Sequence, residues 1–212
     1  MRFRSKDDGV RETLFGDLPL ELWPPEDEPA DEFPWSAFAE ARRDLARGDR
    51  NSAARAWRQV LDAPDLESRH YVQAWHFLRE AGEQPPDDVA KDVLGVVVEV
   101  ALRKGLDVLA VYADRSVRYF NHAGGGVVVD EAEGTLAELV GDVLATAPGV
   151  VESIGPWEGE RPAPPRRGHV RLSFLTPSGL HFGEGPTDAL EQDPLGGEVF
   201  RLATQIMIKL VE

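Results

Sequence analysis

The sequence of 212 residues contains no cysteine, which excludes disulfides, thiolate metal sites, cysteine nucleophiles and redox motifs. It has no run approaching the ~20 apolar residues that cross a membrane, and residues 1–10 lack the apolar core of a secretory signal. Basic residues are scarce, because 23 Lys and Arg stand against 38 Asp and Glu, a net charge of −15. This acidity disfavours nucleic acid and anionic membranes as partners. We therefore expect a cytoplasmic protein, with enough apolar residues (42%) for a hydrophobic core.

Motifs that mark common enzymes are missing as well. The glycine run 124–126 is followed by valines rather than by Lys and Ser or Thr, so it predicts a hairpin turn and no phosphate-binding loop. There is no Gly-x-Ser-x-Gly elbow and no His-Glu-x-x-His pair. His70 and His76 are six residues apart on one predicted helix, which places them on different faces. The sequence thus offers no catalytic residue, no metal ligand and no cofactor, and it favours a protein that is not an enzyme.

Residues 1–34 form an acidic, proline-rich tail with 4 basic and 10 acidic residues. Such a composition favours an extended or disordered segment. Within it, an apolar strip carries alternating leucines, as an extended segment with one buried face would. We call this the docking strip, and its candidate binding residues are Phe15, Leu18, Leu20 and Trp23. The pattern fits docking on the protein's own body and equally a linear motif that binds a partner.

Residues 35–86 predict a helical region with three helices. Apolar side chains recur at spacings of three and four along the first two helices, which are separated by Gly48 and Asp49 and end before Pro64. Asn51 or Ser52 is the expected cap of the second helix. A third helix is expected from about Glu67 to Ala81. The stripes are Trp35, Phe38, Ala41 and Leu45, then Ala53, Trp57, Val60 and Leu61, then Tyr71, Ala74, Trp75 and Leu78.

The stretch over residues 35–64 resembles a tetratricopeptide repeat. The resemblance rests on the Gly48-Asp49 turn, the small Ala53 five places after the glycine, the aromatic Trp57 four places later and the closing Pro64. The proline comes one residue early, and Pro85-Pro86 stands where a further helix would begin. About one and a half units are therefore present. The resemblance implies either a packing element for the rest of the chain or a helical face that binds a partner.

Residues 87–212 predict an α+β domain with a mainly antiparallel sheet covered by helices. We expect a helix from Asp87 to Lys104, although the β-branched run Val96–Val98 also allows a strand there. Strands follow over 107–113, 116–122 and 126–130, and then a helix from Thr135 that ends at Pro148-Gly149. A hairpin over 169–183 and a last helix from Asp193 follow. This order of elements resembles profilin-like sheets, including roadblock domains. That resemblance implies either a protein partner, such as the small GTPases that roadblock proteins scaffold, or a small-molecule ligand.

Strand alternation brings four cationic or titratable side chains to one expected sheet face, away from the helices. A long loop over 155–168 carries Trp157, which is placed to act as a lid. The pattern favours an ordinary solvent surface with paired arginines. The alternative is a site for an anionic ligand, or for an acidic segment such as residues 26–32. The candidate binding residues are Arg118, His122, Arg171 and His181, with Trp157.

Taken together, the sequence favours a non-enzymatic interaction, regulatory or scaffold protein. It would bind another protein through its acidic tail, its helical face and its open sheet face. An oligomer is compatible with this interpretation. The alternative is a module, or an enzyme, that uses the Arg/His sheet face on an anionic small molecule.

Overall fold

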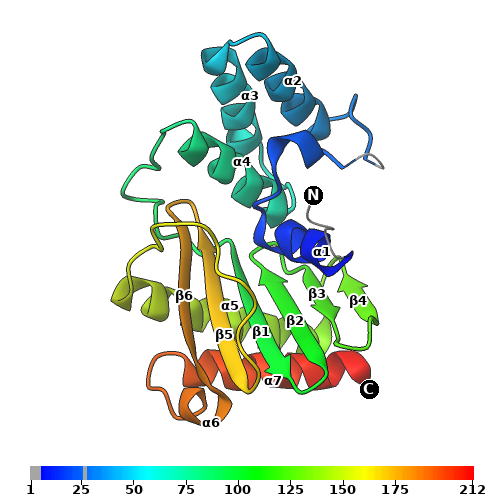
Figure 1. Ribbon diagram of the computed structural model, residues 1–212, viewed down its shortest axis with the longest axis vertical. Coiled ribbons are helices and arrows are strands. Elements are labelled where there is room, and N and C mark those ends of the chain that lie inside the picture. Colours follow the sequence, from blue (N-terminus) through cyan, green and yellow to red (C-terminus); the bar gives the residue numbers. More distant parts are fainter. Residues whose placement is uncertain (1–5, 26–27) are drawn as a thin grey trace. The chain divides into compact units, whose positions relative to one another are not determined.

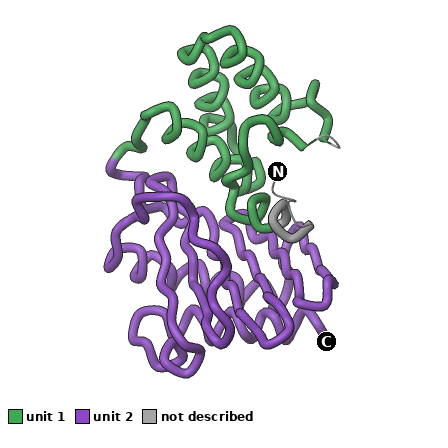
Figure 2. The backbone as a smooth tube through the Cα atoms, viewed as in Figure 1, with its two compact units in different colours: residues 1–86 green, residues 87–212 purple. Residues whose placement is uncertain are grey.

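The computed structural model describes residues 6–25 and 28–212, so parts of the acidic tail, residues 1–5 and 26–27, lie outside the described residues. The chain divides into two compact units, residues 1–86 and 87–212, which are coloured separately in Figure 2. Each unit has its own cluster of buried apolar side chains and is described by itself.

The first unit is helical. Helices α2 (Trp35–Ala46) and α3 (Arg50–Asp62) form a hairpin, and α4 (Ser68–Glu80) packs against α3. The three sequence-predicted helices are thereby confirmed. Asp49, rather than Asn51 or Ser52, caps α3, because its carboxylate accepts the Ser52 backbone N–H at 2.9 Å.

The docking strip is not extended. It comprises the end of helix α1 (Lys6–Phe15), a connecting segment and the short 3₁₀ helix η1 (Leu20–Leu22). Leu18 and Trp23 belong to the same buried cluster as the faces of α2, α3 and α4. Leu18, Leu20 and Trp23 are therefore part of the first unit's core, which for these residues is the self-docking outcome that the sequence left open.

The second unit is α+β, with six strands in one antiparallel sheet of order β4-β3-β2-β1-β5-β6. The strands are β1 (Gly95–Leu102), β2 (Gly105–Tyr112), β3 (Val117–Phe120), β4 (Gly126–Val129), β5 (His169–Thr176) and β6 (Gly179–Pro186). Helices α5 (Gly134–Ser153) and α7 (Gly197–Val211) cover one face of the sheet, as Figure 1 shows, and a short α6 (Thr187–Leu190) follows β6. The apolar core lies between this face and the two helices.

The helix expected over 87–104 is wrong, because this segment contains the central strand β1, which pairs with β2 and β5. Val96, Val97 and Val98 are all buried, so both faces of the strand are covered. A strand buried on both sides shows no alternation, and its β-branched run suits a pleated surface better than a helix. The second unit therefore lacks the first helix of the order on which the profilin-like resemblance was based.

Helix α5 is longer than expected, because it continues through Pro148 to Ser153. Apolar residues on both sides of the proline, Val143 and Val151 among them, are buried in the same core, and this packing extends the helix. Among the described helices, α5 meets the length and apolar content of a membrane span. Its buried positions pack against the sheet and α7, as expected of a core helix.

Candidate functional site

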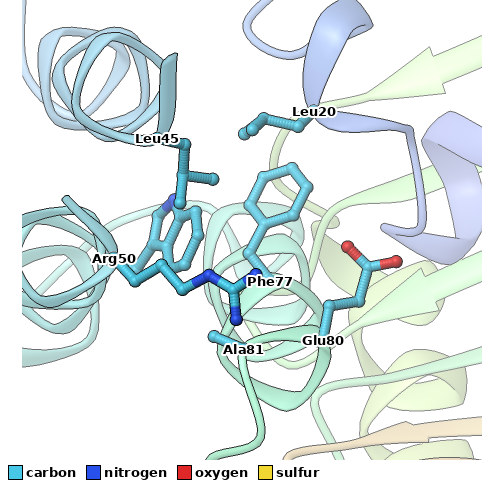
Figure 3. Close-up of a pocket in the computed structure, with 7 residues that line it drawn as sticks. Leu20, Leu45, Arg50, Phe77, Glu80 and Ala81 are labelled. Atoms are coloured by element: carbon cyan, nitrogen blue, oxygen red, sulfur yellow. The ribbon is translucent and has the colours of Figure 1, made fainter. Parts of the chain in front are cut away.

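A solvent-open pocket of about 210 Å³ lies within the first unit (Figure 3). It lies where the end of α2, the start of α3, the end of α4 and helix η1 meet. Apolar side chains form most of its wall, and two side chains of opposite charge complete it. The lining residues are Leu20, Leu45, Arg50, Trp57, Phe77, Glu80 and Ala81.

The tight turn between α2 and α3 gives the pocket one of its sides. Gly48 has φ +80°, a left-handed conformation that glycine adopts without steric cost. Directly after it, Asp49 caps α3 and receives hydrogen bonds from the backbone N–H and hydroxyl of Ser52, which lower the pKa of the Asp49 carboxyl. The turn therefore brings Leu45 near the end of α2 and Arg50 at the start of α3 to the same site.

Two aromatic residues form the deep part of the pocket. Trp57 of α3 and Phe77 of α4 are almost fully buried, and their ring centroids lie 5.3 Å apart. Trp57 is on the stripe predicted for α3, whereas Phe77 is outside the stripe predicted for α4. The pocket forms where residues of three helices meet. The apolar stripe of each helix can be predicted from the sequence, but the hollow between the helices cannot.

The docking strip supplies the last wall. Gln73 of α4 is fully buried, and its side-chain amide binds Leu18 twice, accepting the Leu18 N–H at 3.2 Å and donating to the Leu18 carbonyl at 2.9 Å. Gly16 lies so close to α4 that a Cβ there would come within 2.6 Å of Val72. These contacts fix the chain ahead of η1, so that Leu20 reaches the pocket.

The other strip residues do not present a free docking surface. Trp23 is 1% exposed and lies against Trp35 and Phe38, with ring centroids 5.1 and 5.5 Å away. Phe15 is buried as well, and Leu20 is half-buried in the pocket wall. Of the leucines in the strip, Leu22 is the exposed one. An extended partner-binding motif is therefore not what these side chains form.

In the second unit, Arg171 is a buried ion-pair residue rather than a solvent-facing cation. It is 4% exposed and contacts two carboxylates, Glu99 at 3.4 Å and Glu184 at 3.0 Å. Its guanidinium also donates to the carbonyls of Pro162 and Ala163, at 3.3 and 2.8 Å. Arg171 thereby ties the proline-rich loop 155–168 to the sheet.

His181 lies on the opposite face from Arg171, which corrects the expected grouping. It pairs with Phe174 across β5 and β6, on the helix-covered side, and it is fully buried. Its Nδ1 lies 3.1 Å from the Ile154 carbonyl, which can only accept, so Nδ1 carries the proton and Nε2 accepts from the Ser178 hydroxyl at 3.2 Å. Burial lowers the pKa of His181, against the raising effect of the Ile154 hydrogen bond.

Ser178 and His181 form a hydroxyl–imidazole pair at the turn of the β5–β6 hairpin. Thr176 extends this pair, because its hydroxyl lies 2.9 Å from the Ser178 hydroxyl and donates to the Gly179 carbonyl at 3.0 Å. The Ser178 backbone N–H donates to the Ala90 carbonyl. These contacts fix the turn on both sides, and they give the three polar side chains a structural role.

His122 also lies apart from the arginines. It follows β3, and its Nδ1 lies 2.8 Å from the Asp107 carboxylate, which accepts the Tyr119 hydroxyl at 2.8 Å as well. Burial, and then the neighbouring Asp107, raise the pKa of Tyr119 to about 12. This cluster holds the end of β3 against the start of β2.

Arg118 shares a sheet face with Arg171 but not a site. Arg118 on β3 lies opposite Ala110 of β2 in the sheet register. Arg171 lies on β5, opposite Glu99 of β1. Two strands separate them, or about 14 Å at the usual strand spacing. The four predicted sheet-face residues thus lie in four separate places, and the structure does not assemble them into an anion site.

Trp157 lies on the loop as expected and is half-exposed, with its ring centroid 5.2 Å from that of Phe182. Its indole N–H donates to the Glu160 carbonyl at 3.0 Å. Within residues 6–25 and 28–212, no three His, Asp or Glu side chains are grouped closely enough to hold a metal ion. Among the described residues, the pocket of the first unit is a hollow whose lining combines apolar side chains with one acidic and one basic side chain.

Comparison of the chain with protein-family models, with curated proteins and with solved structures finds no match in any of the three.

Proposed function

We propose that this protein is a non-enzymatic interaction protein, whose first unit binds a peptide segment of a partner protein by seating one apolar side chain in the pocket. The observation that carries the proposal is the pocket itself. It is open, its walls are mostly apolar, and it lies between helices that other contacts hold in place. Binding sites are typically concave and mostly apolar, with a few polar groups that orient the ligand.

The pocket's volume favours an amino-acid side chain over a cofactor as its occupant. Small-molecule sites typically enclose about 300–1,000 Å³, whereas this pocket measures about 210 Å³. Peptide partners commonly anchor one large apolar side chain in such a hollow, and the contacts around it exclude water. Burying one such side chain contributes about 1.5–3 kcal/mol. We therefore expect weak, reversible binding unless the partner makes further contacts.

The chemistry of the lining also favours binding over catalysis. The lining consists of three leucine or alanine residues, two aromatic residues and one residue of each charge, with no hydroxyl, imidazole or thiol that could act as a nucleophile. The hydroxyl and imidazole groups of Ser178 and His181 in the second unit instead fix a hairpin turn. These contacts support an interaction role.

The proposal is tested by filling the pocket without removing a core residue. Ala81 lines the pocket but is exposed, so Ala81→Leu places three extra carbons in the hollow. Ala46→Leu is the matched control, since Ala46 is also exposed near a helix end but does not line the pocket. Peptides selected from a random phage-displayed library on the wild-type chain serve as ligands, and fluorescence anisotropy measures their affinity for all three proteins.

We expect the selected peptides to share one Leu, Phe or Trp. Ala81→Leu should weaken their binding at least about tenfold, whereas Ala46→Leu should leave it within twofold. Thermal unfolding checks that both variants remain folded. Equal binding to Ala81→Leu and wild type, or a selection that enriches no peptide, would overturn the proposal.

A further inference from the structure

The charges beside the pocket identify the class of segment that it takes. Building on the proposed function, we infer that the bound segment is acidic, with one or more carboxylates next to its apolar anchor and facing Arg50. The inference commits to an acidic linear segment of a partner protein. It is argued from the charge of the α2–α3 hairpin, from the free guanidinium of Arg50 and from the position of Glu80.

The α2–α3 hairpin is a basic island on an acidic protein. Helices α2 and α3 with their turn, residues 35–62, hold six arginines against four acidic residues, a net charge of +2, while the whole chain has −15. Opposite charge near a binding site attracts its ligand and raises the rate of encounter. The hairpin therefore favours an acidic ligand, and the acidity of the rest of the chain disfavours acidic ligands elsewhere.

Among these arginines, Arg50 is the one that lines the pocket and has its charge available. Within the described part of the chain, the Arg50 side chain makes no hydrogen bond or ion pair, and it is exposed. Most of its neighbours are engaged: Arg58 with Glu83, Arg47 with Asp44, Arg55 with Ser52 and Arg42 with the Glu21 carbonyl. A guanidinium beside an apolar hollow is suited to a carboxylate next to an apolar anchor.

Glu80 gives one side of the pocket a negative charge, so the two sides of the pocket differ. It extends from the end of α4, whereas Arg50 extends from the start of α3, and Figure 3 shows them on different sides of Phe77. Like charges repel, so a carboxylate on the Glu80 side would weaken binding. A segment with acid on one side of its anchor, and a neutral or basic residue on the other, therefore fits best.

Glu28 of the chain's own acidic tail is not placed to be this ligand. Glu28 forms an ion pair with Arg69 at 3.3 Å, near the start of α4. Glu80 is eleven residues further along the same helix, which is about 16 Å at 1.5 Å per residue. A partner's segment is therefore the occupant that the charges support.

The test uses the full chain and defined peptides labelled with fluorescein. Each peptide has one phenylalanine in a Gly/Ser background, with three glutamates before it in one peptide and after it in another. Matched peptides carry glutamine in place of glutamate. Binding is measured at 50 mM and 500 mM NaCl to wild type, Arg50→Glu and Arg43→Glu, since Arg43 is an exposed hairpin arginine outside the pocket that undergoes the same change of charge.

We expect one acidic peptide to bind the wild type about fivefold or more tightly than its glutamine match at 50 mM NaCl, and this preference to disappear at 500 mM. Arg50→Glu should remove the preference, and Arg43→Glu should change it by less than twofold. If the glutamine peptides bind as well as the acidic ones, while Ala81→Leu still weakens them, the charge inference fails and the pocket proposal stands. If no phenylalanine peptide binds, or Ala81→Leu has no effect, both fail.

Discussion

At the scale of single residues, the second unit depends on a few buried polar groups, of which Arg171 has the most partners. Its guanidinium lies between Glu99, which is fully buried, and Glu184, and it also holds the loop carbonyls of Pro162 and Ala163. A buried ion pair adds little net stability compared with apolar packing. Removing one partner is costly, because it leaves the other charge buried.

We predict that Arg171→Met destabilises the protein by about 3–5 kcal/mol in urea unfolding, since Glu99 then loses the cation that pairs with it. The loop should loosen too, so trypsin should cleave faster after Arg166 and Arg167. In the double variant Glu99→Gln/Arg171→Met, part of the lost stability should return. Arg201→Met serves as the control, because the Arg201–Glu198 pair is exposed and its loss should have little effect. A loss no greater than that of the control would contradict this role for Arg171.

His181 predicts a pH dependence of stability. Its folded-state pKa is lowered by burial, from an ordinary value of about 6.5, with Lys91 adding to the decrease. The unfolded chain therefore takes up a proton before the folded one does. The stabilising contribution is complete above pH 6.5 and is lost as the pH falls from there toward the folded-state pKa.

Urea unfolding at pH 7.5, 6.5 and 5.5 tests this prediction. Wild type should lose more stability than His181→Gln over this range, so the difference between the two should narrow as the pH falls. Parallel losses in the two proteins would show that His181 does not titrate in this way. An NMR titration of the His181 ring gives an independent measure, since its midpoint should lie below 6.5.

At the scale of helices and strands, local sequence signals set where most elements begin and end. Burial in the core overrode some of these signals. The Val96–Val98 run became a strand because β2 and β5 lie on either side of it. Helix α5 continued through Pro148 because Val150 and Val151 beyond it are buried. The turn at Gly48 follows its sequence signal, since a glycine after a helix commonly adopts positive φ.

Two glycine substitutions should have opposite effects on stability. Gly48→Ala forces a side chain into φ +80° and should destabilise the protein by about 1–2 kcal/mol, although nothing crowds the new methyl group. Gly141→Ala lies within α5, with helical φ and open space around it, so it should stabilise by up to about 1 kcal/mol. Denaturant unfolding measures both. Effects of the same sign would mean that backbone conformation does not govern these two sites.

At the scale of the whole molecule, two features matter for function: the separate cores and the uneven charge. Each unit buries its own apolar cluster, so neither requires the other's side chains to form a core. The net charge of −15 is interrupted by the basic α2–α3 hairpin, which carries the proposed binding pocket. The net negative charge of the whole chain therefore does not indicate the charge around the pocket.

Short-range patterns in the sequence were enough for the features that depend on neighbours along the chain. They gave the α+β class, the helices α2 to α4 with their apolar stripes, and the hairpin of β5 and β6, because periodicity, caps and turns act over a few residues. Leu45 and Trp57 of the pocket were on those stripes. The fate of the docking strip was left open, because burial against one's own chain and against a partner require the same apolar residues.

Long-range packing, in contrast, set which faces are covered and which side chains are in contact. It placed His181 under the helices and Arg171 between two carboxylates, because sheet register and the crossing loop set burial, and neither is a local property. It likewise brought Leu20, Arg50 and Phe77 together, although 57 positions of sequence separate the first from the last. A pocket between helices depends on such long-range packing, so no local pattern in the sequence could predict it.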